Sequence, residues 1–233
     1  MDKRWPAHNA TTGEIVGYHC RKDLPDGTKD MYWEDASGNP GLNGFHTKDL
    51  ALYPYPIEPA GEMVVVEGEK CYEALKSIGI PAVGTVCGAP TCPGDDALLP
   101  LVKSDRIVLW PDNDDAGRKQ MSDIARRLHA LGATNLYTVS WTDAPDKGDC
   151  ADAIVQGVDV GVLIAEAAPI PPPFSRTSAA ATLTRAMADP TERSIPALMM
   201  TSVIPIAAVP TIIACTATSL RSNSVSGGCG GIA

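Results

Sequence analysis

The sequence lacks three features that would assign a protein to a common class. Its seven cysteines form no C-x2-C pair and no disulfide-like framework, and their odd number fits a reducing cytoplasm. It contains no phosphate loop of the form G-x-x-x-x-G-K-S/T, so it carries no visible NTP-driven motor. Residues 1–6 are charged and aromatic, unlike a signal peptide. We therefore expect a cytoplasmic protein that is not a disulfide scaffold.

Two further absences concern zinc and positive charge. Cys87 and Cys92 are spaced as half of a zinc site, but no second pair lies nearby, so we interpret them as free thiols. The formal net charge is −9, which argues against a broad basic surface for nucleic acid. An acidic chain can still act on nucleic acid where divalent cations bridge its carboxylates to phosphates and basic residues are clustered locally.

The carboxyl-terminal part, residues 169–233, has little that predicts a folded domain. Three prolines at 171–173 indicate a linker, and residues 194–220 carry no charge at all. That uncharged segment is long enough for a membrane span, but three prolines and seven Ser or Thr residues disfavour it. We predict no membrane span and interpret this part as a linker followed by a disordered or aberrant tail.

Residues 1–60 are rich in turn signals that separate short alternating runs. Asp26-Gly27 lies between the run at 15–20 and the run at 29–33, which predicts a small antiparallel β unit. Arg21 and Lys29 flank this turn, where they would face one another across a hairpin. Solvated hairpin charges are an equally good interpretation of the two residues.

Residues 61–168 alternate strand and helix patterns. Repeated β-α units predict a mainly parallel α/β sheet of about four strands flanked by helices. The expected strands are 63–66, 82–86, 106–110 and 135–139, and the expected helices are 70–78, 96–102, 116–131, 150–155 and 160–167.

Acidic residues follow two of these strands at the point where each ends. Asp112 and Asp114 come directly after the apolar run at 107–110, and Glu67 follows the valines at 64–66. The carboxyl ends of parallel strands meet at one edge of a sheet, where such folds bind ligands. Paired carboxylates with room for water suit Mg²⁺. Taken singly, each acid could instead be a turn or cap residue at a helix N-terminus.

These motifs, in this order, resemble those of a known family. Val-Val-Val-Glu67-Gly68, then Leu-Trp-Pro-Asp112-Asn-Asp114-Asp-Ala-Gly117, then Lys147-Gly-Asp149 are similar to the three motifs of the Toprim domain. The order is most like that of the bacterial-type primase branch, particularly phage and plasmid primases and primase-helicases. The resemblance covers about residues 10–168, with the β unit at 1–60 similar to the amino-terminal subdomain of the primase core.

The resemblance implies a chemistry and a set of roles. It implies primase-type nucleotidyl transfer, in which RNA primers are made from NTPs on a single-stranded DNA template, with a replicative helicase as a further partner. Glu67 would be the general base or acid, and Asp112, Asp114 and Asp149 would hold Mg²⁺ or Mn²⁺. Nucleotide or template phosphates would contact basic residues, for which the candidates are Lys70, Arg118, Lys147, Arg21 and Lys29.

Two departures from the family pattern leave alternatives open. Primases often carry an aspartate four residues after the motif glutamate, where this chain has Cys71. The last motif often reads D-x-D, whereas Asp149 and Asp152 are three residues apart, and whether Asp152 joins the metal site stays open. The alternatives are a Toprim-type metal-dependent nuclease, which uses the same carboxylates, and a nucleic-acid or nucleotide-binding module with little turnover.

Overall fold

The computed structural model describes residues 2–88 and 91–173. These residues lie within the first of the two units into which the chain divides. The uncharged segment 194–220 and most of the predicted tail lie outside the described residues. Nowhere in the described ranges is a helix both long enough and apolar enough to cross a membrane.

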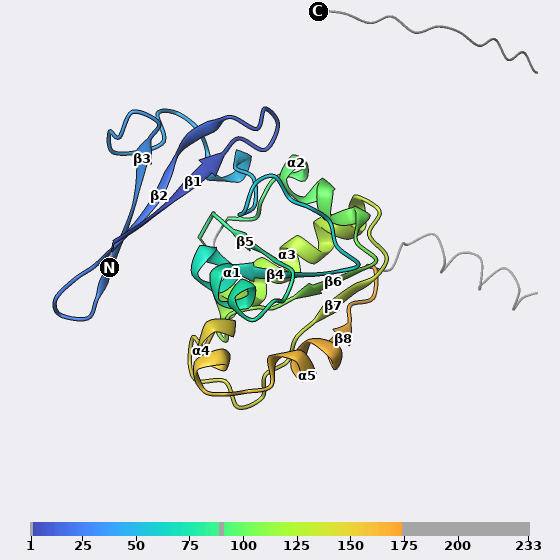
Figure 1. The fold of residues 1–233 in the computed structure, drawn as a ribbon. Helices are drawn as coiled ribbons and strands as arrows, with labels where there is room; N and C mark the ends of the chain where they lie inside the picture. The colour runs from blue at the N-terminus through green and yellow to red at the C-terminus, as the bar shows by residue number, and fades with distance from the viewer. Residues whose placement is uncertain (1, 89–90, 174–233) are drawn as a thin grey trace, which may run out of the picture. The chain divides into compact units, whose positions relative to one another are not determined.

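The first 35 residues form the predicted small antiparallel unit, with one strand more than the sequence indicated. Strands β1 (Lys3–His8), β2 (Ile15–Asp23) and β3 (Lys29–Asp35) are ordered β1-β2-β3 (Figure 1). Gly27, in the turn between β2 and β3, has a φ of +83°, a conformation that glycine adopts without strain. β1 was not identified from the sequence, because Pro6 weakens a strand pattern. Pro6 is tolerated there because β1 is an edge strand.

The second sheet has five strands in the order β5-β4-β6-β7-β8. Strands β4 (Glu62–Glu67), β5 (Ala82–Thr85), β6 (Arg106–Leu109) and β7 (Leu136–Thr138) are parallel, as predicted. The two-residue β8 (Ala168–Pro169) pairs antiparallel with β7 and adds a strand to the expected four. The mainly parallel α/β class is therefore confirmed, while the proposed division at residues 60 and 168 stays a prediction.

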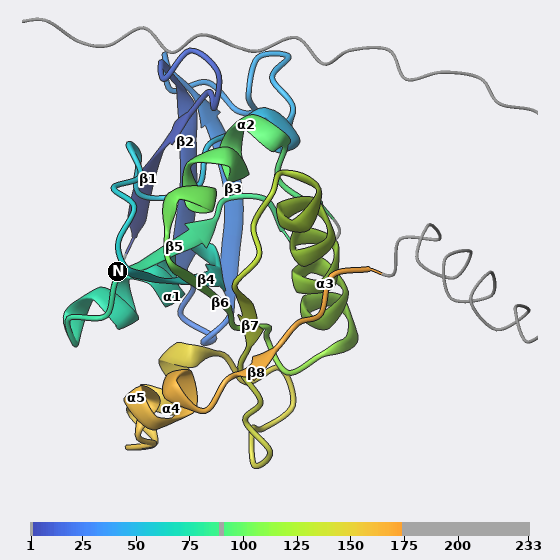
Figure 2. The same ribbon diagram turned by 90° about the vertical axis from the view of Figure 1, so that its right-hand side faces the viewer.

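Helices cover both faces of this sheet (Figure 2). Along β4 the valines alternate, so that Met63 and Val65 pack on one face with α3 (Asp115–Ala130). Val64 and Val66 pack on the other face with the remaining long helix and two short ones. Those helices are α1 (Gly68–Ser77), α4 (Cys150–Val155) and α5 (Val160–Ala165). The described residues also form the short helix α2 (Asp95–Leu98) and two 3-10 helices, η1 (Thr47–Asp49) and η2 (Leu99–Lys103).

The connections place a switch point in the strand order between β4 and β6, where such folds commonly have a ligand-binding crevice. From β4 the chain passes through α1 to β5, and from β6 it passes through α3 to β7 on the other side. The strand order therefore reverses between β4 and β6, and open α/β sheets bind ligands at the carboxyl ends of strands at such a point. Glu67 and Asp112 follow these two strands, so the fold brings the two predicted acidic motifs to this crevice.

Candidate active site

Glu67 is positioned by a tight turn from strand to helix. It is the last residue of β4 and the N-cap residue of α1, and Gly68 follows with a φ of +78°. A Cβ on Gly84 of the neighbouring strand β5 would lie 2.4 Å from the Gly68 carbonyl oxygen. The glutamate–glycine turn therefore depends on a second glycine, one strand away, that leaves room for its backbone.

Asp112 and Asp114 lie on the turn that joins β6 to α3. Asp114 caps α3, because its Oδ1 accepts a hydrogen bond of 2.7 Å from the Gly117 amide. A Cβ on Gly117 would lie 2.9 Å from the backbone N and O of Asp112, so only glycine fits there. The Asp-x-Asp-x-Ala-Gly spacing thus folds the helix start directly against Asp112.

Asn113, between the two aspartates, ties this turn to the loop that carries Asp149. Its side-chain amide donates to the carbonyl oxygens of Ala144 and Pro145 at 3.0 and 2.9 Å. Its backbone amide donates to the Gly148 carbonyl, and its carbonyl accepts from the Lys147 amide. The second and third motifs are therefore held together by backbone hydrogen bonds, although they are more than thirty residues apart.

Asp149 is engaged at both of its oxygens. Oδ1 accepts from the Asp152 amide at 2.9 Å, and the Asp152 side chain accepts from the Asp149 amide, which completes a capping box on α4. Oδ2 accepts from Lys70 Nζ at 2.8 Å. Burial alone would raise the pKa of Asp149, but the hydrogen bonds from Lys70 and the Asp152 amide hold it below its usual value.

One cavity of about 390 Å³ joins the two sheets and contains six of the predicted site residues. Glu67 and Asp112 follow strands of the parallel sheet and Asp149 caps α4, whereas the basic residues come from the three-stranded sheet and from α1. Its lining includes Glu67, Asp112, Asp149, Lys70, Arg21 and Lys29. The fold therefore brings together residues that lie between positions 21 and 149 of the chain.

Within this cavity, Asp112 has the least favourable environment for a negative charge. Its pKa rises from 3.8 to about 8, because burial disfavours the charged form and because Glu67, Asp149 and Asp114 repel it. Lys70 opposes the shift without cancelling it. Asp112 thus has an excess of negative charge around it, which a bound cation would relieve.

The carboxylates suit a metal that arrives with its substrate better than a fully protein-coordinated one. In the described ranges, no three His, Cys, Asp or Glu side chains form a ready-made ligand set. Mg²⁺ typically keeps several waters and binds one or two carboxylates together with substrate phosphates. The hard oxygen donors and the repulsion at Asp112 fit that mode of binding.

Cys71, which stands where primases often have an aspartate, supplies no negative charge. It lines the cavity and is buried. A hydrogen bond with the Cys150 thiol and its burial raise the pKa of Cys71 well above 9.0. A protonated thiol is a poor ligand for a hard cation, so this departure reduces the acidic set by one member.

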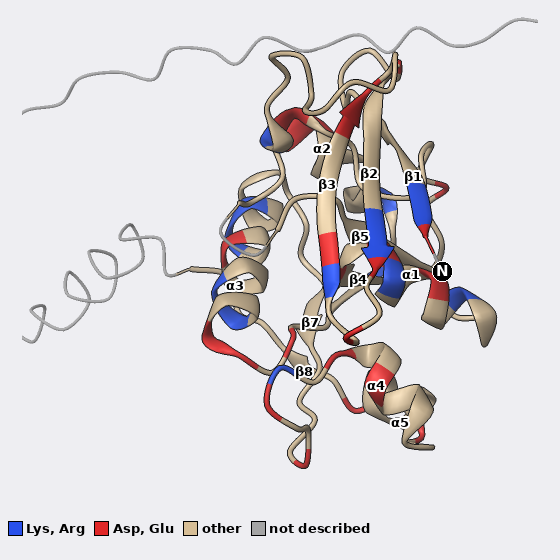
Figure 3. Cartoon of the chain, turned by 90° about the vertical axis from the view of Figure 1, so that its left-hand side faces the viewer, with Lys and Arg blue, Asp and Glu red and all other residues tan. Residues whose placement is uncertain are grey.

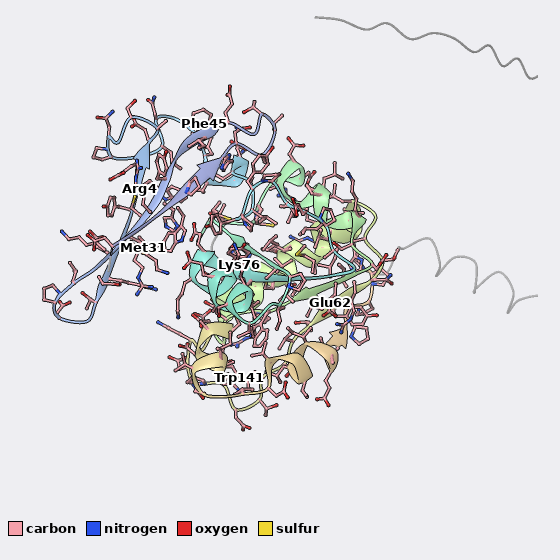
Figure 4. All side chains as sticks on the ribbon, viewed as in Figure 1. Arg4, Met31, Phe45, Glu62, Lys76 and Trp141 are labelled. Carbon is pink, nitrogen blue, oxygen red and sulfur yellow. The ribbon has the colours of Figure 1, made fainter. Side chains whose placement is uncertain are left out.

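The basic side of the cavity belongs to the hairpin of β2 and β3. Figure 3 shows Lys and Arg gathered towards one end of the three-stranded sheet. In the strand register Arg21 pairs with Met31, and Asp23 pairs with Lys29 two positions further along. Arg21 and Lys29 therefore lie on the same face of the hairpin but in successive pairs of that face. They do not face one another directly, as the sequence had suggested, but both line the cavity beside Met31 (labelled in Figure 4).

Three predicted residues do not line this cavity. Asp114 lies close enough to raise the pKa of Asp112 but is used as a helix cap. Arg118 is exposed and donates to Asp115 at 2.8 Å and to Asn113 at 3.1 Å. Lys147 is exposed, with a φ of +58°. Arg118 instead lines a neighbouring cavity of about 310 Å³ that also contacts Asp112.

Sequence reasoning missed three residues of the cavity. His19 on β2 and Glu69 on α1 form a hydrogen-bonded pair, 2.9 Å apart, that links the three-stranded sheet to this helix. Thr85, at the end of β5 opposite Glu67, is 1% exposed, and its hydroxyl has no hydrogen-bond partner in the described part of the chain. A buried hydroxyl without a partner is costly, so a ligand or a water in the cavity would stabilise it. No local pattern marks any of the three.

Comparisons with known proteins bear on the fold. No family model and no curated protein sequence matches the chain. Among solved structures, the primase domains of two bacteriophage T7 gp4 subunits match with a TM-score of 0.51 and 21% identity, over 73% of this chain and 80% of theirs. The fold is that of a primase catalytic domain.

Two bacterial structures agree with this assignment. The DnaG primase catalytic domain bound to ssDNA matches with a TM-score of 0.52 and 20% identity over 71% of this chain, and the Escherichia coli primase catalytic core with 0.52 and 19% over 79%. This chain spans 53% and 55% of those two chains, about half of their length. The predicted resemblance to the primase branch is therefore confirmed for the fold.

Proposed function

We propose that this chain catalyses Mg²⁺-dependent nucleotidyl transfer, joining NTPs into RNA primers on a single-stranded DNA template during phage- or plasmid-like DNA replication. The observation that carries the proposal is the single cavity lined by Glu67, Asp112 and Asp149 on one side and by Arg21 and Lys29 on the other. A nucleoside triphosphate needs both groups for its reaction, because the carboxylates share a metal with it and the cations face its phosphates.

The carboxylates would hold the metal through Asp112 and Asp149, with Asp114 contributing an oxygen that its helix cap does not use. When bound, Mg²⁺ would neutralise the triphosphate and lower the pKa of the attacking 3′-hydroxyl. Asp112 is the strongest candidate ligand, because its ionised form is disfavoured by its neighbours until a cation is present. Manganese, with the same ligand preferences, would serve as a substitute.

The remaining residues would act on the proton and on the phosphates. Glu67, which lines the cavity, would accept the proton of the attacking 3′-hydroxyl. Arg21 and Lys29 would contact nucleotide or template phosphates, and Lys70 would shield the negative charge of Asp149. Arg118 and Lys147, outside the cavity, are assigned to the path of the template rather than to the triphosphate.

What other primase-fold structures bind supports this choice of substrates. The gp4 primase domains are bound to an RNA/DNA hybrid and dTTP, and the DnaG domain is bound to ssDNA. A helicase, supplied as a separate protein or as a further domain, would deliver template to the cavity and would be the natural partner. We place the reaction in the cytoplasm.

Primer synthesis on single-stranded DNA with NTPs and Mg²⁺ tests the proposal. The full chain should make short RNA products, and Glu67→Gln and Asp112→Asn should each lower the rate by about 100-fold or more. Asp115→Asn is the matched control, since the Asp115 side chain is fully exposed on the same turn. Equal product from all four proteins contradicts the assignment. Metal-dependent cleavage of DNA without NTPs would instead indicate a nuclease.

A further inference from the structure

The pair formed by His19 and Glu69 joins the three-stranded sheet to α1, but its geometry is more specific than holding these two elements together requires. Glu69 is on α1, two residues after Glu67, and its side chain is 3% exposed. Both of its carboxylate oxygens lie within hydrogen-bond distance of His19 Nδ1, at 2.9 and 3.1 Å. Both residues line the cavity that contains Glu67 and Asp112.

A different contact already anchors the three-stranded sheet on α1. One turn further along the helix, Glu73 accepts a hydrogen bond of 2.7 Å from Trp5 Nε1 and forms an ion pair with Lys3. Trp5 is buried, so this contact is well placed to hold the two elements together. Unlike Glu73, both His19 and Glu69 line the cavity that contains the reacting carboxylates.

The imidazole of His19 is held in one orientation. Trp5, His19 and Trp33 are in register across the three strands, so their side chains share one face of the sheet. The Trp33 ring stacks on the imidazole with centroids 4.4 Å apart and an interplanar angle of 17°. A ring that is stacked on one side and hydrogen-bonded at Nδ1 has little freedom left.

The burial of Glu69 determines which nitrogen of His19 is available. A carboxylate this buried is costly unless a strong donor faces it, so Nδ1 of His19 must carry the proton that it donates. Within the described residues the imidazole makes no other hydrogen bond. The second nitrogen, Nε2, therefore remains available to a ligand in the cavity.

We propose that His19, oriented by Glu69, is the general acid that protonates the departing pyrophosphate. The proposal rests on the nucleotidyl-transfer function and names one further catalytic residue for it. His19 and Arg21 both line the cavity and share one face of β2, two residues and about 7 Å apart along the strand. Because Asp112 lines the same cavity, a triphosphate with its α-phosphate at Asp112 has His19 and Arg21 as donors for its β- and γ-phosphates.

The step balances in protons and electron pairs. The 3′-oxygen forms a bond to the α-phosphorus while its proton passes to Glu67. The bond between the α-phosphorus and the bridging oxygen breaks, and that oxygen, as part of pyrophosphate, takes the proton from His19 Nε2. The imidazole is left neutral, with Nδ1–H still donating to Glu69, and solvent restores the proton on Nε2. The charged groups around this step are Glu67, Glu69, Lys70, Asp112, Asp149, Arg21 and Lys29.

The decisive experiment measures how strongly the rate depends on the leaving group. The rate of single-turnover dinucleotide formation is measured with ATP and with analogues whose β,γ-bridging oxygen is replaced by CH2 or CF2. The CH2 analogue has the more basic leaving group and the CF2 analogue the less basic one. A general acid reduces the disadvantage of a basic leaving group. His19→Gln should therefore lower the rate with ATP by about 100-fold and should enlarge the CF2-to-CH2 rate ratio by about tenfold. ATP affinity should stay within about twofold of wild type.

A second histidine in the same sheet supplies the matched control. His8 on β1 also uses Nδ1, with the Gly13 carbonyl at 2.9 Å, and also stacks on an aromatic ring, that of Tyr55. It does not line the cavity. His8→Gln should leave the rate and the rate ratio unchanged, whereas Glu69→Gln should give an intermediate ratio, because an amide can still orient the ring.

The outcomes separate this inference from the function on which it rests. An unchanged rate ratio in His19→Gln, with wild type active, overturns the general-acid role and leaves nucleotidyl transfer standing. A lower rate with an unchanged ratio and weakened ATP binding also overturns it, since that result describes a phosphate contact or a structural role. Absence of dinucleotide with wild type and all variants overturns both.

Discussion

Replacing Asp112 with asparagine should stabilise the metal-free protein at alkaline pH. Burial and the repulsion of Glu67, Asp149 and Asp114 raise the pKa of Asp112 from 3.8 to about 8. Because the folded-state pKa lies above the unfolded one, the folded chain holds a proton that the unfolded chain has released. The aspartate therefore has no effect on stability below about pH 4 and lowers the free energy of unfolding progressively up to about pH 8.

The magnitude follows from the size of the shift. A displacement from 3.8 to about 8 corresponds to at most about 6 kcal/mol between the two protonation states. The site is open to water through the cavity, so screening reduces the net effect to about 2 to 4 kcal/mol. Asparagine has nearly the same shape and no charge, so Asp112→Asn should recover most of that free energy above pH 8.

Urea denaturation at pH 5 and pH 9, in EDTA and a reducing agent, measures the effect. The stability difference between Asp112→Asn and wild type should grow by about 2 kcal/mol between the two pH values. The control Asp115→Asn removes a fully exposed carboxylate from the same turn and should show no such growth. Mg²⁺ at pH 9 should stabilise wild type more than Asp112→Asn. A stability difference that is the same at both pH values would refute the electrostatic account of Asp112.

Three further results are expected. Gly117→Ala should lower the free energy of unfolding by about 1 to 3 kcal/mol and impair primer synthesis, because its Cβ would lie 2.9 Å from the Asp112 backbone. The control is Gly161→Ala in α5, where a Cβ has room, and it should be neutral in the same denaturation assay. Lys70→Met should tighten Mg²⁺ binding about threefold to tenfold in calorimetry by removing a cation from Asp149, whereas Lys76→Met at the other end of α1 should not. Arg21→Ala and Lys29→Ala should weaken binding to single-stranded DNA and reduce its salt dependence in fluorescence titrations, and Lys22→Ala, the adjacent exposed lysine of β2, should have a smaller effect.

The sequence was most informative where a strand pattern ends in an acid and a glycine. Val64 to Val66 and the run before Asp112 predicted buried parallel strands, and the convergence of their carboxyl ends follows from the geometry of such sheets. The glycines in these motifs are explained by the positive φ of Gly68 and by the close approach of Gly117 to the Asp112 backbone. These features are local, so periodicity and turn chemistry suffice to predict them.

The cross-sheet contacts could not be predicted, because they depend on how two sheets pack. His19 and Glu69 are fifty residues apart in sequence, and nothing near either residue marks it as a partner of the other. β1 was missed because its Lys-Arg-Trp-Pro-Ala-His sequence has no β-branched residue, and tertiary packing of Trp5 outweighs that propensity. Asp114 caps α3, as one of its two interpretations expected, and it also raises the pKa of Asp112; its role as a metal ligand stays a prediction.

Asp112 and Asp149, the two proposed metal ligands that line the cavity, have pKa values shifted in opposite directions. This difference indicates how a divalent cation would bind there. Asp149 is satisfied by Lys70 and by its capping box, so its pKa is low and its charge is already compensated. At Asp112 the attraction of Lys70 is outweighed by burial and by the neighbouring carboxylates, so its pKa is about 8 without a cation. A divalent ion arriving with a nucleotide would therefore gain most at Asp112, and at Asp149 it would compete with the ammonium of Lys70. The ammonium of Lys70 would then be released towards the phosphates, so metal binding and phosphate binding would reinforce each other at this cavity.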